Sequence, residues 1–291
     1  MINYDPKAWL RVSFSWKGTV IPRVLGRLLF LLVLTVALLL VREFVSGTDP
    51  IFKPFKPLGH TLIGVALGLL IVFRNNCSYD RYWEGRKLWG GIVNASRNLL
   101  RGATAYVGDT KELANLIAAY SLALKQHLRN NKDIAEIQSL VSPAIYAQAT
   151  AAANPPSIIA YHISLWIKAR FDEKKIDSHT AYGLETQVRA ILDCQGGCER
   201  ILRTPIPFAY AVHIKQLLML YLITLPFILV GEMQWVALPT VAAIAFGLLG
   251  IEEAGVEIED PFGDDPNDLP VEAMCATIAR DTTALAEAGK V

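Results

Sequence analysis

Long stretches without charged residues lie near both ends of this 291-residue chain, and the middle of the chain is polar. Four apolar segments flanked by charged residues stand out, at residues 28–41, 57–73, 216–231 and 233–251. A helix needs about 20 predominantly apolar residues to cross a bilayer. Only 19% of the residues are charged, whereas soluble domains average about 25%. The pattern predicts membrane-spanning helices rather than a soluble helical protein with unusually apolar core helices.

The first and third segments need help from their flanking residues to span a bilayer. Segment 28–41 is short, but Arg27 and Arg42 stand at its ends, and their long side chains can reach the headgroups. The third segment extends back towards Thr204 if it includes Lys215. We expect Lys215 to face a partner helix or a water-filled cavity, because an ammonium group is costly to expose to lipid.

Basic residues near the segment ends predict the orientation, because cytoplasmic loops are enriched in Lys and Arg. They gather before the first segment and after the second, at Arg11, Lys17, Arg23, Arg27, Arg74, Arg81, Arg86, Lys87, Arg97 and Arg101. The link between the first two segments has Arg42, Lys53 and Lys56, and the link between the last two has no basic residue. We therefore expect a multi-pass protein of the cell (inner) membrane with both termini cytoplasmic. The N-terminal stretch lacks the pattern of a cleavable signal.

The polar middle of the chain is predicted to be helical. Residues 111–130 carry apolar side chains at three- and four-residue steps, which is typical of an amphipathic helix. Residues 177–203 are expected to form another long helix, interrupted or bent at Gly196 and Gly197. Residues 144–156, which end in Asn154, Pro155 and Pro156, are predicted to be a loop, with Ser157 capping the next helix. No segment shows the two-residue alternation of a strand, so no sheet is expected.

The sequence contains none of the common catalytic or cofactor motifs, such as a phosphate-binding loop, a dinucleotide glycine pattern, a nucleophile elbow or a zinc-protease helix. The formal net charge of +1 gives no basic signal for nucleic acid. Cys194 and Cys198 do not have zinc-knuckle spacing, and we interpret them as reduced thiols on a helix. We predict a protein that is not an enzyme, requires no cofactor and binds no nucleic acid.

Three bulky apolar residues of the second segment, Val65, Leu69 and Phe73, lie four residues apart and therefore share one helical face. On an adjacent face, Gly64 and Gly68 form a pair of small residues that permits close helix contact. In a symmetric ring, neighbouring subunits would pack through the glycines and the bulky side chains would form a narrow apolar constriction. The spacing alone leaves open that these side chains face lipid or another helix.

The stretch after this segment, FRNNCSYDRYWEGRKLWG at residues 73–90, resembles the bestrophin family. Two further stretches agree in the expected order, RTPIPFAY at residues 203–210 and EDPFGDDPNDLP at residues 259–270. With the hydropathy pattern, the resemblance covers nearly the whole chain except residues 133–156. It implies an all-α homopentameric ion channel with four transmembrane helices per subunit around a central pore and a helical cytosolic region. The partners would be further copies of the chain, membrane lipid and small inorganic ions.

The resemblance also implies a division of the chain. The expected parts are a cytosolic N-terminal segment (1–27), transmembrane helices 1 and 2 (28–78), a helical cytosolic region (79–203), transmembrane helices 3 and 4 (204–253) and a cytosolic acidic segment with a C-terminal helix (254–291).

The family's pore elements are expected at particular positions of this chain. The three apolar rungs of its neck fall on Val65, Leu69 and Phe73, and a cytosolic aperture falls near Thr180 or Ala181. Animal members have two aromatic rungs and conduct anions, whereas this chain has only Phe73, and bacterial relatives include cation-selective channels. We therefore expect a passive channel for anions such as chloride, with a sodium- or potassium-selective channel as the alternative. Glu252, Glu253 and Glu257 would favour cations, and Arg74 and Arg81 anions, if they faced the pore.

The acidic stretch at residues 259–270 has two interpretations. Asp264, Asp265 and Asp268 offer hard oxygen ligands, and in animal bestrophins an acidic cluster here forms a calcium clasp with backbone oxygens near the N-terminus. Pro266 and Asn267 stand where that cluster has acids. The alternative to a calcium site is a solvated acidic loop that docks on a neighbour.

Two other classes of function remain to be distinguished. A secondary transporter would usually show paired interrupted helices in two matching halves, and the sequence has no such internal symmetry. A membrane-anchored scaffold or intramembrane enzyme would show no ion flux.

Overall fold

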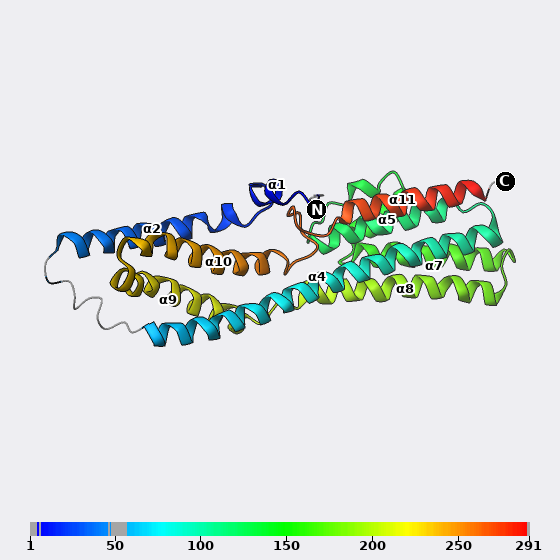
Figure 1. Cartoon of the computed structure of the whole chain (residues 1–291). Helices are drawn as coiled ribbons and strands as arrows, with labels where there is room; N and C mark the ends of the chain where they lie inside the picture. The colour runs from blue at the N-terminus through cyan, green and yellow to red at the C-terminus, as the bar shows by residue number, and fades with distance from the viewer. Residues whose placement is uncertain (1–4, 6, 46, 48–56, 290–291) are drawn as a thin grey trace. The chain divides into compact units, whose positions relative to one another are not determined.

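The computed structural model describes residues 5, 7–45, 47 and 57–289, and these residues form helices and connecting segments without a β-strand (Figure 1). Lys53 and Lys56, which contributed to the predicted orientation, lie outside the described residues. The elements are α1 (Trp9–Ser13), α2 (Ile21–Phe44), α4 (Pro57–Val107), α5 (Lys111–Leu128), η1 (Ala135–Ile137), α6 (Pro143–Ala151), α7 (Pro155–Asp172), α8 (Ser178–Arg203), α9 (Phe208–Met233), η2 (Gln234–Val236), α10 (Ala237–Glu257) and α11 (Val271–Ala288). The all-helical fold class is confirmed.

The described chain divides into two compact units. We call the first the apolar unit; it comprises the residues up to Arg81, Pro205–Asp260 and Asp265–Asn267. The second, the polar unit, comprises Tyr82–Thr204, Pro261–Asp264 and the residues from Asp268 onward.

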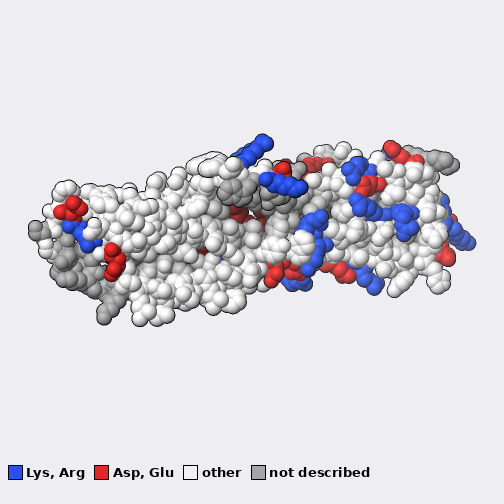
Figure 2. Space-filling model, in the orientation of Figure 1, with Lys and Arg blue, Asp and Glu red and all other residues white. Residues whose placement is uncertain are grey.

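Three stretches of the described chain are helical, long and apolar enough to cross a membrane: Ile21–Phe44, Pro57–Val107 and Phe208–Glu257. The last contains two helices, α9 and α10, because Gln234 adopts a positive φ of 54° and the short η2 turn follows it. In Figure 2 the surface over α2, α9 and the first part of α4 is nearly free of charged side chains. Such a surface is typical of helices that face lipid.

A layer of aliphatic side chains holds the apolar unit together. Helix α10 packs against α2 and α9, and α2 packs against α9. The buried core residues are Val24, Leu31, Leu67, Ile71, Ile214, Leu218, Leu222, Leu225, Val241, Ala245 and Leu249. They recur at steps of three, four or seven residues along their helices, so each helix keeps a second face for its surroundings.

The second apolar segment does not end its helix where its charge-free run ends. We expected a span at residues 57–73, but α4 continues without a break to Val107 and has 51 residues. At 1.5 Å per residue this helix is more than twice as long as a bilayer crossing requires. Arg74 and the following polar residues therefore continue the same helix, because they are compatible with helical geometry and no proline or capping signal interrupts them.

The polar unit is a helical bundle with its own core. Helix α5 packs against α7 and α11, and α7 packs against α8. The predicted amphipathic stripe of residues 111–130 is confirmed, because Leu113, Leu116, Ile117, Tyr120 and Leu124 are all buried in α5.

Residues 144–156 are mostly helical, so the predicted loop is wrong. Helix α6 starts after Ser142, whose side chain accepts a hydrogen bond from the Ile145 N–H at 3.4 Å. Helix α7 starts after Asn154, whose Oδ1 accepts from the Ser157 N–H at 3.2 Å, so Asn154 and not Ser157 is the N-cap. Pro155 and Pro156, which suggested a loop, stand in the first turn of α7, where a missing N–H costs nothing.

Helix α8 is continuous from Ser178 to Arg203, so Gly196 and Gly197 do not interrupt it. Gly197 is buried, and a Cβ atom there would lie 2.6 Å from Cδ2 of Leu88 in α4. A Cβ at Gly196 would have no heavy atom within 4 Å. Gly197 thus permits close packing, whereas Gly196 has no such role.

We predict opposite effects for alanine at these adjacent positions. Gly197→Ala should lower the free energy of unfolding by about 1 to 3 kcal/mol through overpacking against Leu88. Gly196→Ala should leave stability unchanged or raise it by about 0.5 to 1 kcal/mol, since alanine is the better helix former. Thermal unfolding of the purified protein measures both. Equal destabilisation by the two variants would contradict the packing role of Gly197.

Candidate functional site

The predicted neck residues lie on the outward face of α4 within the apolar unit. The exposed fractions of Val65, Leu69 and Phe73 are 70%, 57% and 53%. On the other side of the helix, Leu67 and Ile71 are buried in the core. Successive members of the exposed stripe rise by about 6 Å along the helix axis. This stripe, which we call the α4 stripe, is not used to fold the subunit and is available to line a space or to meet a partner.

The two glycines beside the α4 stripe behave differently from each other. A Cβ at Gly64 would lie 3.0 Å from the hydroxyl of Tyr221 in α9, so Gly64 packs within its own chain. The ring of Tyr221 also stacks on His60, with centroids 3.9 Å apart. Gly68 has no neighbour within 4 Å. The expectation that both glycines pack against a neighbouring subunit is therefore wrong for Gly64, because Tyr221 fills that space.

The predicted cytosolic aperture falls on the first turn of α8. Asp177 caps the helix, and its Oδ1 accepts a hydrogen bond from the Thr180 N–H at 2.7 Å. Thr180 is half-buried and lines a cavity of about 440 Å³ together with Arg101 and Gln187. Ala181 packs against the core of the polar unit. Of the two candidates, Thr180 is the one that faces an open space.

Charged residues at the ends of the apolar segments form a cluster inside the apolar unit, which the sequence did not reveal. Arg74 is only 2% exposed, and its Nη1 donates to the Glu252 carbonyl oxygen at 3.1 Å and to Glu252 Oε1 at 3.3 Å. Its Nη2 donates to Glu259 Oε2 at 3.4 Å. Arg74 and Glu252 therefore pair with each other inside the apolar unit, and both side chains are nearly fully buried.

Glu252 is shared by cations from three helices. Its carboxylate lies 3.3 Å from Arg74 of α4, 3.6 Å from Arg27 of α2 and 4.0 Å from Lys215 of α9. Arg27 also pairs with the adjacent Glu253. A buried carboxylate needs such partners because an unpaired charge in an apolar setting is strongly unfavourable. Lys215 is the most distant of the three cations and its side chain is 56% exposed, so the expectation that it faces a partner helix or a water-filled cavity stays a prediction.

The three stretches that carry the family resemblance meet at one carboxylate. Glu259 receives Arg74 on one oxygen and the Ile206 N–H, at 3.3 Å, on the other. Its backbone carbonyl accepts from Arg81 Nε at 3.0 Å. Arg74 and Arg81 belong to the first stretch, Ile206 to the second and Glu259 to the third. The three stretches therefore build one polar junction in this chain.

In the apolar unit, Arg23 and Asn267 make polar contacts at the acidic stretch where calcium was expected. Arg23 Nη2 lies 3.1 Å from Asp265 Oδ2 and 3.6 Å from Glu257 Oε1. Asn267 Nδ2 donates to the carbonyl oxygen of Gly18 and to Glu257 Oε1, both at 3.0 Å. Nitrogen donors thus connect the N-terminal segment to this acidic stretch.

In the polar unit, Arg129 contacts the other residues of the acidic stretch. Its guanidinium donates to the carbonyl oxygens of Phe262 and Gly263 at 3.1 and 3.0 Å, and it pairs with Asp264 at 3.0 Å and with Glu272 at 2.5 Å. Asp268 is buried. Within the described part of the chain, no group of three or more His, Cys, Asp or Glu side chains could hold a metal ion. Calcium binding at Asp264, Asp265 and Asp268 stays a prediction.

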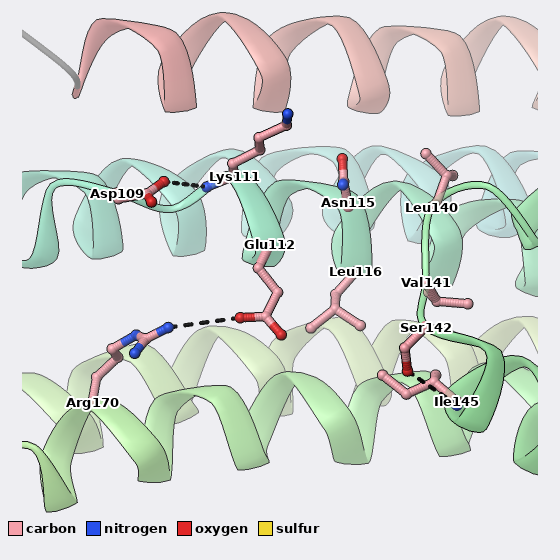
Figure 3. A pocket seen from close by; sticks show the side chains of 10 residues that line it. All are labelled: Asp109, Lys111, Glu112, Asn115, Leu116, Leu140, Val141, Ser142, Ile145 and Arg170. Atoms are coloured by element: carbon pink, nitrogen blue, oxygen red, sulfur yellow. Dashed lines mark hydrogen bonds and ion pairs between the residues drawn. The ribbon is translucent and has the colours of Figure 1, made fainter.

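The remaining candidate groups of the polar unit are structural. Burial raises the pKa of the Cys194 and Cys198 thiols, and both are free, as expected for helix thiols. Figure 3 shows a cavity of about 380 Å³ where Glu112 and Arg170 form an ion pair at 3.6 Å. Asp109 and Lys111 add one charge of each sign to its lining. The mixed charges offer no arrangement suited to catalysis.

The long apolar helices pair their few charged residues within the apolar unit and leave the α4 stripe exposed. These features define a helical integral membrane protein. A family model described as bacterial/fungal bestrophin protein matches residues 1–284. The chain belongs to the bacterial and fungal bestrophin family, which is a family of membrane ion channels and not of enzymes.

Curated relatives and solved structures agree with this assignment. Proteins named voltage-dependent anion channel-forming protein, from Nostoc sp. and Synechocystis sp., are each 38% identical over 94% of this chain and 91% or 90% of their own length. A bacterial bestrophin homologue from Klebsiella pneumoniae has a TM-score of 0.86 and 27% identity, covering 91% of this chain and 98% of that chain.

Loss of Arg74 should destabilise the protein far more than loss of an exposed arginine. Arg74→Leu leaves Glu252 buried without its closest partner and should lower the free energy of unfolding by about 3 to 5 kcal/mol. Arg200→Leu, which removes the exposed pair with Glu84, should cost no more than about 1 kcal/mol. Thermal unfolding in detergent compares the two variants, and similar losses would contradict the role assigned to the buried cluster.

Acid should weaken the contact between Arg129 and Glu272. Burial raises the pKa of Glu272, but the hydrogen bond and positive charge of Arg129 lower it more, so the pKa lies below its ordinary value. The pair therefore stabilises the folded state above about pH 4.3, the ordinary glutamate pKa, and this contribution is lost as the pH falls through the lower pKa of the folded protein. Between about pH 3 and 6, the free energy of unfolding should depend less on pH for Glu272→Gln than for the natural chain. Identical pH profiles would refute the assignment.

Proposed function

We propose that this protein is a passive ion channel in which several copies of the chain surround a central pore, and that the α4 stripe lines its neck. The observation that carries the proposal is the exposure of Val65, Leu69 and Phe73 on a helix apolar enough to cross a membrane. Bulky apolar side chains with no role in the subunit core suit a constriction that controls hydration of passing ions. Five copies would form the ring, as the family resemblance implies.

We further propose that the channel conducts anions such as chloride. The names of the Nostoc and Synechocystis relatives support this sign. The alternative is a cation-selective channel of the same architecture. The pairing of Arg74 with Glu252 supports selectivity by ion dehydration at the neck rather than by these charges.

The proposed subunit crosses the cell membrane four times, with α2, the first part of α4, α9 and α10 as the crossings. The Gln234 break between α9 and α10 supports two crossings in the third apolar stretch. Residues 1–27, 79–203 and 254–291 would then be cytosolic, together with both termini. Thr180 would lie at the cytosolic aperture, and any calcium would bind near Asp264, Asp265 and Asp268.

Replacing Val65, Leu69 and Phe73 together by alanine should widen the neck and raise the single-channel conductance. The measurement is current through purified protein in planar bilayers. A matched control replaces Leu29, Val33 and Leu40 by alanine, since these side chains are also exposed and apolar but lie on α2. Unchanged current in the first variant, or an equal increase in the control, would exclude the α4 stripe as the neck.

The ion sign and subunit number have direct tests. Under a potassium chloride gradient, the reversal potential should move towards the chloride equilibrium potential, and a shift towards the potassium value would establish the cation-selective alternative. Native mass of the detergent complex should equal five chains. Flux that saturates and is coupled to a second ion would instead indicate a secondary transporter.

A further inference from the structure

A cavity of about 470 Å³ lies in the apolar unit at the side of α2, α9 and α10. Its lining includes Phe30, Met219 and Ile223, which are apolar, and it is completed by Arg27, Lys215 and Glu252. Phe30 and Met219 are more than half exposed, and Ile223 is exposed too, so the apolar wall is open to the surroundings of the chain. The cavity is thus a groove with an apolar wall and a charged end.

The charged end of the groove lies at one level along the helices. Arg27 is the seventh residue of α2, and Lys215 is the eighth residue of α9. Each is therefore about 10 Å from the first residue of its helix. Glu252 lies five residues before the end of α10, at a similar depth. In the proposed orientation this level is close to the cytoplasmic headgroup region.

Lys215 keeps unused capacity for an anion. Its side chain is 56% exposed, and its ammonium is 4.0 Å from Glu252, which is beyond hydrogen-bond distance. Glu252 already lies closer to Arg74 and to Arg27. Arg27 is already paired with Glu252 and Glu253, so Lys215 is the cation at this end of the groove without a close acidic partner.

We propose that this groove binds an anionic phospholipid of the cytoplasmic leaflet, whose phosphate contacts Lys215 and whose acyl chain lies along Phe30, Met219 and Ile223. This inference rests on the proposed membrane crossing but not on conduction. The charge complementarity selects an anionic headgroup, and the apolar wall selects a hydrocarbon chain. A free phosphate would match only the first feature. Occupation also explains how an apolar helix tolerates Lys215 in its first turns, because the lipid phosphate completes its pairing.

Lipid retention by the full-length assembled protein tests the natural chain first. The protein is incubated in detergent with dioleoylphosphatidylglycerol, with dioleoylphosphatidylcholine or with inorganic phosphate. Native mass spectrometry then counts the retained lipids, and thermal unfolding measures stabilisation. We expect about fivefold tighter retention of phosphatidylglycerol than of phosphatidylcholine, the increment of one lysine near an anionic lipid. Inorganic phosphate alone should not stabilise the protein.

Two pairs of variants test the two ends of the groove. Lys215→Gln should abolish the preference for phosphatidylglycerol, whereas Lys168→Gln removes an exposed lysine of α7 and should leave it intact. Met219→Trp should fill the groove and reduce retention of both lipids. Leu220→Trp is the matched control, because Leu220 is the adjacent exposed residue of α9 and does not line the groove.

Three outcomes would overturn the proposal. Equal retention of the two lipids by the natural chain would show that the groove does not select an anionic headgroup. Stabilisation by inorganic phosphate alone would indicate a free-anion site. A disulfide formed between subunits through Met219→Cys would show that a second copy covers the groove. Because lipid retention is read without ion flux, a failed channel assay and a failed lipid assay remain distinguishable.

Discussion

The pairing of Glu252 with Arg74, Arg27 and Lys215 is the interaction on which the apolar unit depends. Each of these four residues stands directly beside an apolar segment of the sequence, and the four lie on four different helices. In an apolar setting a charge must be paired with good geometry. The aliphatic core brings α2, α9 and α10 together without direction. The shared carboxylate adds the direction, because it specifies which ends of the helices meet.

The internal pairing of Arg74 with Glu252 limits which side chains of the apolar unit can act on ions. Arg74 and Glu252 are buried and paired with each other, whereas the α4 stripe of Val65, Leu69 and Phe73 is exposed. An apolar stripe acts on an ion through the cost of dehydration. The same economy of charge leaves Lys215 only loosely paired at the end of an apolar groove. The buried charges therefore stabilise the apolar unit, and the exposed apolar side chains are available for the proposed function.

Much of the helix content followed from periodicity and hydropathy. The stripe of α5 was predicted because alternation between buried and exposed positions is local to one helix. The errors arose where local signals were ambiguous. Prolines at residues 155 and 156 suggested a loop, yet Asn154 caps a helix that starts with them. Gly197 suggested a break, yet it permits close packing against Leu88 of α4. The two residues are more than about 100 positions apart, roughly one third of the chain.

The sequence by itself determined the fold class, the apolar stretches and the family, since these depend on composition, spacing and motifs along the chain. It also placed Val65, Leu69 and Phe73 on one face of a helix. Only the tertiary structure decided that this face is outward, that Gly64 serves its own chain and that Arg23 and Arg129 engage the oxygens of the acidic stretch. The physical reason is that burial and ion pairing are relations between distant residues, which no local pattern records.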